Sequence, residues 1–235
     1  MNKQFNQFAK LYDELFSAAI DYEKEVEFYD KILNKHHCKK ILEVGCGCGN
    51  RGKYFVNRKY DYVGSDISDS MLRIARKKYP GLEFIHSDAR NLKLRRKFDA
   101  ILFLGKGSAY LTTDDDVMSA LKSMKRLINK GLIIIDGFNA DFIIPNFKKN
   151  ISWSIKTGNK TITRSSINVL KPNTNIWKRE LCYIVQEDKA KKTFHDKAIL
   201  RAFAESEFKS FFTKAGIKNT EFIINGDTII SIGIM

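Results

Sequence analysis

The sequence predicts an α/β fold in which a largely parallel sheet is covered by helices on both faces. Short, almost wholly apolar runs such as KKILEVG and FDAILFLG alternate with amphipathic segments along residues 39–138. Strands buried on both faces are continuously apolar, whereas strands with one solvated face alternate apolar and polar residues. Regular alternation of such strands with helices indicates parallel strands joined by helical crossovers.

The expected elements follow in order along the chain. Two helices come first, at 5–19 and 24–36, because their apolar residues recur at spacings of three and four; residues 1–36 are therefore an N-terminal helical cap. Strands are then expected at 39–45, 61–66, 82–88, 98–105 and 131–138, with helices at 50–58, 69–78 and 112–130 between them. Gly131 is the expected stop of the last of these helices.

The pattern changes after residue 138. Residues 140–198 hold short β-like pieces separated by turn signals, such as Gly158-Asn159, which predicts a small antiparallel insertion after the fifth strand. A helix over 204–215 follows, and two β-like runs around Asn225-Gly226 predict a terminal hairpin. The whole chain, 1–235, is expected to form one domain.

Composition and charge limit the classes of function. No apolar run approaches the ~20 residues of a membrane span, and the N-terminus lacks the apolar core of a signal peptide, so a cytoplasmic protein with no membrane partner is expected. The net charge is +14, from 41 Lys and Arg against 27 Asp and Glu. This excess is compatible with an acidic partner such as RNA, but the lysines are scattered, which is more typical of a solvated surface.

The segment ILEVGCGCGN, residues 41–50, contains Cys46 and Cys48 and invites a metal or redox interpretation. A metal would need further ligands, and His36, His37 and Cys38 lie at the other end of the strand, ~15 Å away at ~3.3 Å per residue. One tetrahedral site cannot use both groups. Redox pairs are typically Cys-x-x-Cys. We therefore expect no metal site, and small size is the expected role of both cysteines.

The glycines of the same segment predict a nucleotide-binding loop. Gly45, Gly47 and Gly49 lie where a strand turns into a helix, where the backbone turns sharply and free N–H groups face a ligand. Asp66 ends the next strand 17 residues later, so its carboxylate can accept hydrogen bonds from two ribose hydroxyls. These features alone suit NAD as well.

A second pattern separates the two cofactors. The acid-x-G-x-G-x-G of Glu43 to Gly49, Asp66, the HSDAR segment with Asp88, and FDAILFLGKGSAYL after it resemble the class I S-adenosylmethionine-dependent methyltransferases, in particular small-molecule enzymes related to glycine N-methyltransferase and sugar N-methyltransferases. The resemblance covers roughly residues 8–138 and the last strands. It implies a Rossmann-like, seven-stranded sheet whose terminal strand is antiparallel.

The resemblance also implies the cofactor site. Glu43 would fix the loop and, through water, the amino group of S-adenosylmethionine, while Asp88 and Ala89 would read the adenine edge and Met71 would pack on the ring. Tyr12 and Tyr22 are the candidates near the methionine carboxylate. The full expected set, for S-adenosylmethionine or its product S-adenosylhomocysteine, is Tyr12, Tyr22, Glu43, Gly45, Cys46, Gly47, Asp66, Ile67, Met71, Asp88, Ala89, Leu104 and Gly105.

The same comparison narrows the acceptor. Leu104-Gly105-Lys106-Gly107 lacks the proline-containing segment of amino-methylating nucleic-acid enzymes, no Pro-Cys occurs, and Asp136 alone is a poor match to cation-dependent enzymes. We therefore expect methyl transfer to N or O of a small molecule, and the sequence does not identify a catalytic residue. The insertion would form the acceptor lid, with Trp153, Trp177 and Tyr183 suited to line it.

Alternatives stay open at this level. Residues 140–200 carry 12 Lys and Arg against 5 Asp and Glu, so an RNA or protein methyltransferase could dock through this segment; a cofactor-binding module without catalysis is a third reading. The sequence does not identify the acceptor, decide between N and O transfer, or distinguish a monomer from a homodimer.

Overall fold

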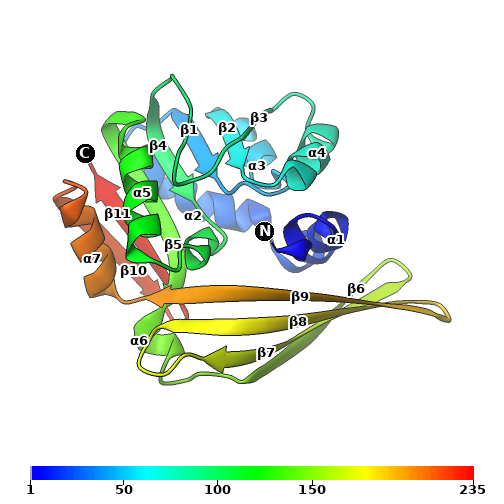
Figure 1. The fold of residues 1–235 in the computed structure, drawn as a ribbon. Helices are drawn as coiled ribbons and strands as arrows, with labels where there is room; N and C mark the ends of the chain where they lie inside the picture. Colours follow the sequence, from blue (N-terminus) through cyan, green and yellow to red (C-terminus); the bar gives the residue numbers. More distant parts are fainter. Residues whose placement is uncertain (1) are drawn as a thin grey trace.

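The computed structural model describes residues 2–235, and within this range the strands join into one eleven-stranded sheet with helices on both faces (Figure 1). The helices are η1 Lys3–Phe5, α1 Ala9–Ala19, α2 Tyr22–Lys35, α3 Gly52–Asn57, α4 Asp69–Lys78, η2 Gly107–Tyr110, α5 Asp114–Lys125, α6 Ala140–Ile143 and α7 Glu205–Lys214. The strands are β1 Lys40–Val44, β2 Asp61–Asp66, β3 Glu83–His86, β4 Phe98–Phe103, β5 Ile128–Asn139, β6 Asn150–Thr157, β7 Lys160–Leu170, β8 Ile176–Glu187, β9 Ala190–Phe203, β10 Asn219–Asn225 and β11 Thr228–Ile234.

The first five strands form the predicted parallel core, in the order β3-β2-β1-β4-β5. The terminal strand β11 pairs antiparallel with β5, and β10 pairs antiparallel with β11, as the hairpin signal indicates. The carboxyl ends of β1 and β4 are neighbours, and at this point the strand order reverses. In open α/β sheets such a switch point is where ligands bind.

Alternating residues of β1 show why its sequence is continuously apolar. Leu42 and Val44 pack in the cluster formed with α5 and α7, whereas Ile41 packs on the other face with α2, α3 and α4. All three side chains are at most 2 % exposed. Both faces of the parallel core are therefore covered, as the sequence predicts.

The helix expected over 112–130 is shorter than predicted. Thr113 caps α5 by accepting a hydrogen bond from the Asp116 N–H, but the helix ends at Lys125 and β5 begins at Ile128. Gly131 does not stop a helix; it lies inside β5, where an added Cβ would sit 1.9 Å from the Asp99 carbonyl oxygen. The prediction was wrong because Leu127 and Ile128 fit the helical period and the strand equally well.

The insertion is larger and more regular than the sequence indicated. Its strands β6 to β9 form an antiparallel meander, and the long strand β9, over Ala190–Phe203, had no prediction. The end of β9 pairs in parallel with β5 through Phe138 and Ala202, so the insertion continues the main sheet and its boundary lies at 203 rather than 198. The expected seven strands did not include the insertion, and with β6–β9 the described sheet has eleven strands.

The N-terminal cap lies between the two halves of the sheet. In Figure 1, α1 lies between the carboxyl ends of the parallel strands and the long strands of the insertion. Gln4 of η1 joins them, because its side chain bonds both Tyr183 of β8 and Tyr110 of η2. Among residues 2–235, no helix is long and apolar enough to cross a membrane.

Candidate cofactor and acceptor site

A cavity of about 390 Å³ lies at the carboxyl ends of β1 and β4, beneath α1 and α2. Its volume is within the range of small-molecule sites. Seven of the predicted residues line it: Tyr12, Tyr22, Gly45, Cys46, Gly47, Leu104 and Gly105. The sequence motifs that are distant along the chain therefore meet at one site.

The glycine loop forms the floor of this cavity. Gly47 and Gly49 have φ angles of +56° and +72°, which side chains rarely adopt. A Cβ on Gly49 would lie 2.5 Å from the Phe84 ring, so close packing also requires glycine there, whereas Gly47 faces open space. The loop thus brings bare backbone to the cavity, as a nucleotide-type ligand requires.

Asp66, at the end of β2, holds the glycine loop through hydrogen bonds. One carboxylate oxygen accepts a hydrogen bond from the Gly47 N–H and the other from the Ser68 N–H, both at 2.8 Å. Burial raises the pKa of Asp66, against these hydrogen bonds. Ser68, not Asp66, caps α4, since its hydroxyl accepts from the Met71 N–H. Each Asp66 oxygen has a further lone pair, so the predicted ribose contact stays available.

Glu43 lies beneath the cavity with no exposed surface. It accepts hydrogen bonds from Arg51 Nη1 at 3.1 Å and from the Tyr62 hydroxyl at 2.6 Å. Burial raises the pKa of Glu43, and Arg51 and Tyr62 oppose that rise. Its immediate role is to hold Arg51, and its predicted contact through water stays a prediction.

Arg51 is a wall residue that the sequence did not single out. Its Nε and Nη2 donate to Glu25 at 3.0 and 2.9 Å, and its guanidinium lies 5.3 Å from the centre of the Tyr22 ring. Burial alone would lower the pKa of Arg51, but Glu25 and Glu43 outweigh it. Glu25 is 26 residues from Arg51 in the chain, so no local signal reveals the pair.

Asp136 and Lys106 form a second unpredicted group on the wall. The carboxylate of Asp136 accepts from the backbone N–H groups of Gly105 and Lys106, at 2.9 and 2.7 Å. The sequence relates Asp136 only to cation-dependent enzymes, whereas its observed hydrogen bonds hold the loop after β4. Other wall residues without a prediction are Asp13, Phe16, Ile20, Tyr29, Asn50 and Thr228.

The residues predicted for the adenine do not line this cavity. Ile67 is exposed, and Met71 is 1 % exposed in contact with Cys48 Sγ at 3.2 Å. Asp88 is paired with Arg90, which lowers the pKa of Asp88, and Ala89 packs against the core. Their adenine contacts therefore stay predictions, and Asp88 must share its carboxylate with Arg90.

Two aromatic residues expected to line an acceptor pocket are core residues. Trp177 and Tyr183 are 2 % and 1 % exposed. Trp177 packs against Phe138 and Phe147, and Tyr183 contributes to the cluster that contains Leu15 of α1. Neither residue lines the cavity, because the insertion needs them to anchor it to the rest of the fold.

Cys38 lies at the opposite end of β1 from Cys46 and Cys48, as their positions in the sequence predict. Cys38 Sγ lies 3.5 Å from the Asp99 carbonyl oxygen at the amino end of β1, whereas Cys46 and Cys48 follow its carboxyl end. Burial raises the pKa of Cys38, to about 11, and that of Cys46. Among residues 2–235, no three His, Cys, Asp or Glu side chains gather into a metal-binding group.

We predict that Cys48→Ser leaves cofactor binding nearly unchanged, because the side chain acts by its small size. The measurement is calorimetry with S-adenosylhomocysteine, together with metal analysis of both purified proteins. Cys182→Ser, in the insertion, is the matched control. Stoichiometric zinc in the wild type that disappears in Cys48→Ser would contradict this assignment.

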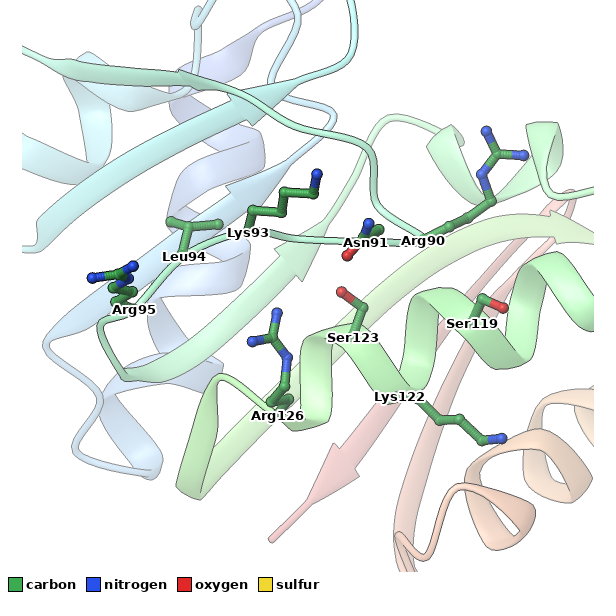
Figure 2. Close-up of a pocket in the computed structure, with 9 residues that line it drawn as sticks. All are labelled: Arg90, Asn91, Lys93, Leu94, Arg95, Ser119, Lys122, Ser123 and Arg126. Carbon is green, nitrogen blue, oxygen red and sulfur yellow. The ribbon is translucent and has the colours of Figure 1, made fainter.

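A second concavity, of about 570 Å³, lies between residues 90–95 and α5 (Figure 2). Five cationic side chains surround it, Arg90, Lys93, Arg95, Lys122 and Arg126, and none of its described lining residues is acidic. It contains no glycine loop and none of the predicted cofactor residues. Its charge accounts for part of the basic excess, but its position excludes it as the cofactor site.

Comparison with known proteins agrees with a methyltransferase site at the carboxyl ends of β1 and β4. Residues 41–131 match a family model described as a methyltransferase domain. The chain is 25% identical over 200 residues, covering 79% of it and 78% of the relative, to the dTDP-3-amino-3,4,6-trideoxy-alpha-D-glucopyranose N,N-dimethyltransferase of Streptomyces venezuelae.

Solved structures share the fold. The crystal structure of Streptomyces venezuelae DesVI matches with a TM-score of 0.87 at 23% identity, over 97% of this chain and 98% of that one. SAM-bound CalS10, an amino pentose methyltransferase from Micromonospora echinaspora, matches with a TM-score of 0.78 at 20% identity, over 92% of both chains. Since the motifs, the fold and the family model agree, residues 41–131 form a methyltransferase domain, and the protein is an S-adenosylmethionine-dependent methyltransferase.

Proposed function

We propose that the enzyme methylates an amine nitrogen of a small molecule that also carries an anionic group, with a nucleotide-linked amino sugar as the acceptor class. One relative named above is an N,N-dimethyltransferase of a dTDP-linked amino sugar, and CalS10 is an amino pentose methyltransferase; both support nitrogen as the accepting atom. S-adenosylmethionine supplies a methyl group made electrophilic by its sulfonium.

The observation that carries the anionic group is a pair of arginines on the insertion. Among residues 2–235, neither Arg164 nor Arg179 has a carboxylate within 4.0 Å. Burial lowers the pKa of Arg179 to about 10, and Arg164 adds to that effect. Two partly buried cations that lack acidic partners carry an uncompensated desolvation penalty. An anionic substituent of the acceptor would offset it.

These arginines lie next to the cavity wall. The Phe138 ring contacts both the Arg179 guanidinium, at 5.8 Å, and Lys106 Nζ, at 5.6 Å. Arg164 is also among the charged neighbours of Tyr12, whose pKa is raised by burial. An acceptor with its amine in the cavity would therefore have its anionic group within reach of the insertion.

For the cofactor, we propose that the nucleoside lies on the Asp66 side and the methionine moiety beneath α1 and α2. Asp66 would bind the ribose hydroxyls, and the adenine would lie near Ile67, Met71, Asp88 and Ala89. Tyr12, Tyr22 and the Glu43–Arg51 pair would surround the methionine moiety, and Leu104 and Gly105 would close over the methyl donor. Gly45, Cys46 and Gly47 would approach the cofactor through their backbone.

The proposed contact between Asp88 and the adenine amino group can be tested with a cofactor analogue that lacks this group. We expect S-adenosylhomocysteine to bind more tightly than its inosine analogue, since that analogue lacks the amino group and leaves the carboxylate unpaired. In Asp88→Ala this difference should largely vanish, as measured by calorimetry. Asp116→Ala removes the other partner of Arg90 and should keep the difference. Equal binding of both analogues by the wild type, or displacement by NAD, would refute this assignment.

The proposed acceptor class can be tested by measuring methylation of amino sugars that carry a nucleotide and of the same amino sugars without it. We expect methylation of the nucleotide-linked amine. In Arg179→Met we expect a roughly 10- to 150-fold higher KM, the effect of losing a charged hydrogen bond of about 1.5–3 kcal/mol. Lys178→Met, whose side chain is exposed, should keep the wild-type KM. Cofactor affinity should not change in either variant.

Other results would overturn the proposal. Equal KM values for the nucleotide-linked and the free amino sugar would contradict an anion-binding subsite at Arg164 and Arg179. Methylation of RNA instead, with an affinity that falls steeply with salt, would support the basic insertion as a nucleic-acid surface. Cofactor binding without turnover of any amine would indicate a binding module.

A further inference from the structure

Lys106 occupies a backbone position that favours glycine. It follows β4 directly after Gly105, and the two residues have φ angles of +62° and +76°. A left-handed conformation at a non-glycine residue is unfavourable and concentrates at functional sites. Both backbone N–H groups donate to Asp136, so the fold holds this conformation in place and fixes where the lysine side chain begins.

The Lys106 amino group lies in the cavity wall without an ion-pair partner. Nζ bonds the Gly137 carbonyl oxygen at 3.1 Å and Thr228 Oγ1. Among residues 2–235, no carboxylate lies within 4.0 Å of it. The charged groups that face it are Asp136 on β5, Asp227 in the β10–β11 turn and Glu25 on α2; burial lowers the pKa of Lys106 although all three oppose this.

The two hydrogen bonds of Lys106 Nζ leave its lone pair without a partner in residues 2–235 when the amine is uncharged. An uncharged lysine nitrogen has two N–H donors and one lone pair. The Gly137 oxygen and Thr228 Oγ1 can accept both donors, so the lone pair has no partner in the described chain. This arrangement suits a base, since an ammonium would instead leave a third donor unpaired in a partly buried wall.

We propose that Lys106 is the general base that removes a proton from the acceptor ammonium before methyl transfer. An amine attacks only through its lone pair, and a protonated amine has none. In this step an N–H bond of the acceptor breaks and an N–H bond forms at Lys106 Nζ. The acceptor becomes a neutral amine and Lys106 becomes an ammonium.

The structure also provides a route for the proton to leave. Thr228 Oγ1 accepts from Lys106 and donates to the Asp227 carboxylate at 2.9 Å. Asp227 is exposed in the hairpin turn. A proton on Lys106 can therefore pass along the hydroxyl to a surface carboxylate and then to water, which restores the base for the next turnover.

The location agrees with the proposed function, on which this inference rests. Asp66 ends β2 on one side of the glycine loop, whereas Lys106 follows β4 on the other side. If the nucleoside lies at Asp66, the methyl donor extends towards β4 and β5. Lys106 is then on the side of the cavity where the acceptor nitrogen must come.

Activity measurements separate a base from a positioning residue. We expect Lys106→Met to lower kcat at neutral pH by about 10²–10⁴-fold and to regain activity as pH rises and the acceptor amine loses its proton to solvent. Lys106→Arg keeps the charge and the donors but cannot act as a base, so it should be as slow as Lys106→Met. Thr228→Val should reduce kcat less. Lys191→Met, at an exposed position near the start of β9, is the control.

A second measurement does not depend on an acceptor. Trace acetylation with acetic anhydride between pH 6 and 10, followed by mass spectrometry, reports the fraction of each lysine that is uncharged. We expect Lys106 to reach half of its maximal labelling rate at least one pH unit below Lys191, and S-adenosylhomocysteine to change the rate at Lys106 alone. Calorimetry with this ligand should show affinities within about twofold for all variants, which confirms folding.

The outcomes distinguish this inference from the proposed function. If wild type methylates the nucleotide-linked amine but Lys106→Arg restores kcat, Lys106 only positions the acceptor and the base assignment fails. If Lys106 labels at the same pH as Lys191, it also fails. If no amine is methylated but Lys106 is acetylated at a lower pH than Lys191, the proposed acceptor class is wrong, whereas the uncharged state of Lys106 that the base assignment requires is supported.

Discussion

Replacing Arg51 by methionine is expected to lower the free energy of unfolding by about 3–5 kcal/mol, because one partner of a buried ionic network is removed. Arg51 is 7 % exposed, Glu43 is fully buried, and Glu25 is bonded to the same guanidinium. Urea unfolding at pH 7 measures the loss. Arg96→Met, which breaks the exposed pair with Glu83, should lose at most about 1 kcal/mol.

The loss should depend on pH. Without Arg51, burial raises the pKa of Glu43 with less opposition. A carboxyl whose folded-state pKa is raised destabilises the fold above that pKa, and stability returns as pH falls through it towards the unfolded value of about 4.3. The difference from wild type should shrink at acidic pH and in the double variant Glu43→Gln/Arg51→Met. A small, pH-independent loss would show that the network contributes little.

Asp66→Ala is expected to weaken cofactor binding by about 1.5–3 kcal/mol, roughly 10- to 150-fold, because a charged hydrogen-bond acceptor is lost. The structure adds a second reason, since Asp66 also holds the Gly47 N–H and thereby the glycine loop. Calorimetry with S-adenosylhomocysteine is the measurement. Asp69→Ala, an exposed acid three residues along the chain, should bind normally. Unchanged affinity in Asp66→Ala would remove the ribose assignment.

Local chemistry made the glycine loop and its place at the edge of the sheet predictable. A backbone that needs positive φ in three positions within five residues requires glycines, so Gly45, Gly47 and Gly49 mark the turn in the sequence itself. Strands buried on both faces must be continuously apolar, so β1, β2 and β4 were visible. Asp66 could then be placed, because carboxyl ends of parallel strands meet at one edge of the sheet.

The rest of the cavity wall depends on contacts that no local pattern encodes. Glu25 meets Arg51 across 26 residues, Asp136 meets the loop after β4 across about 30, and Lys106 meets Thr228 across 122. The basic insertion looked like separate short strands, yet β9 completes the main sheet through Phe138 and Ala202.

By itself, the sequence determined the order of the parallel strands and their helices, the glycine loop and the cofactor class, since each depends on the conformation or burial of neighbouring residues. Only the tertiary structure decided which charges are paired, because pairing depends on which distant segments the sheet order brings together. Arg51 is neutralised by two acids while Arg164, Arg179 and Lys106 have no carboxylate partner within 4.0 Å in residues 2–235. A cationic side chain is structural in the first case, whereas in the others we propose that it faces a ligand, and that difference arises from long-range packing.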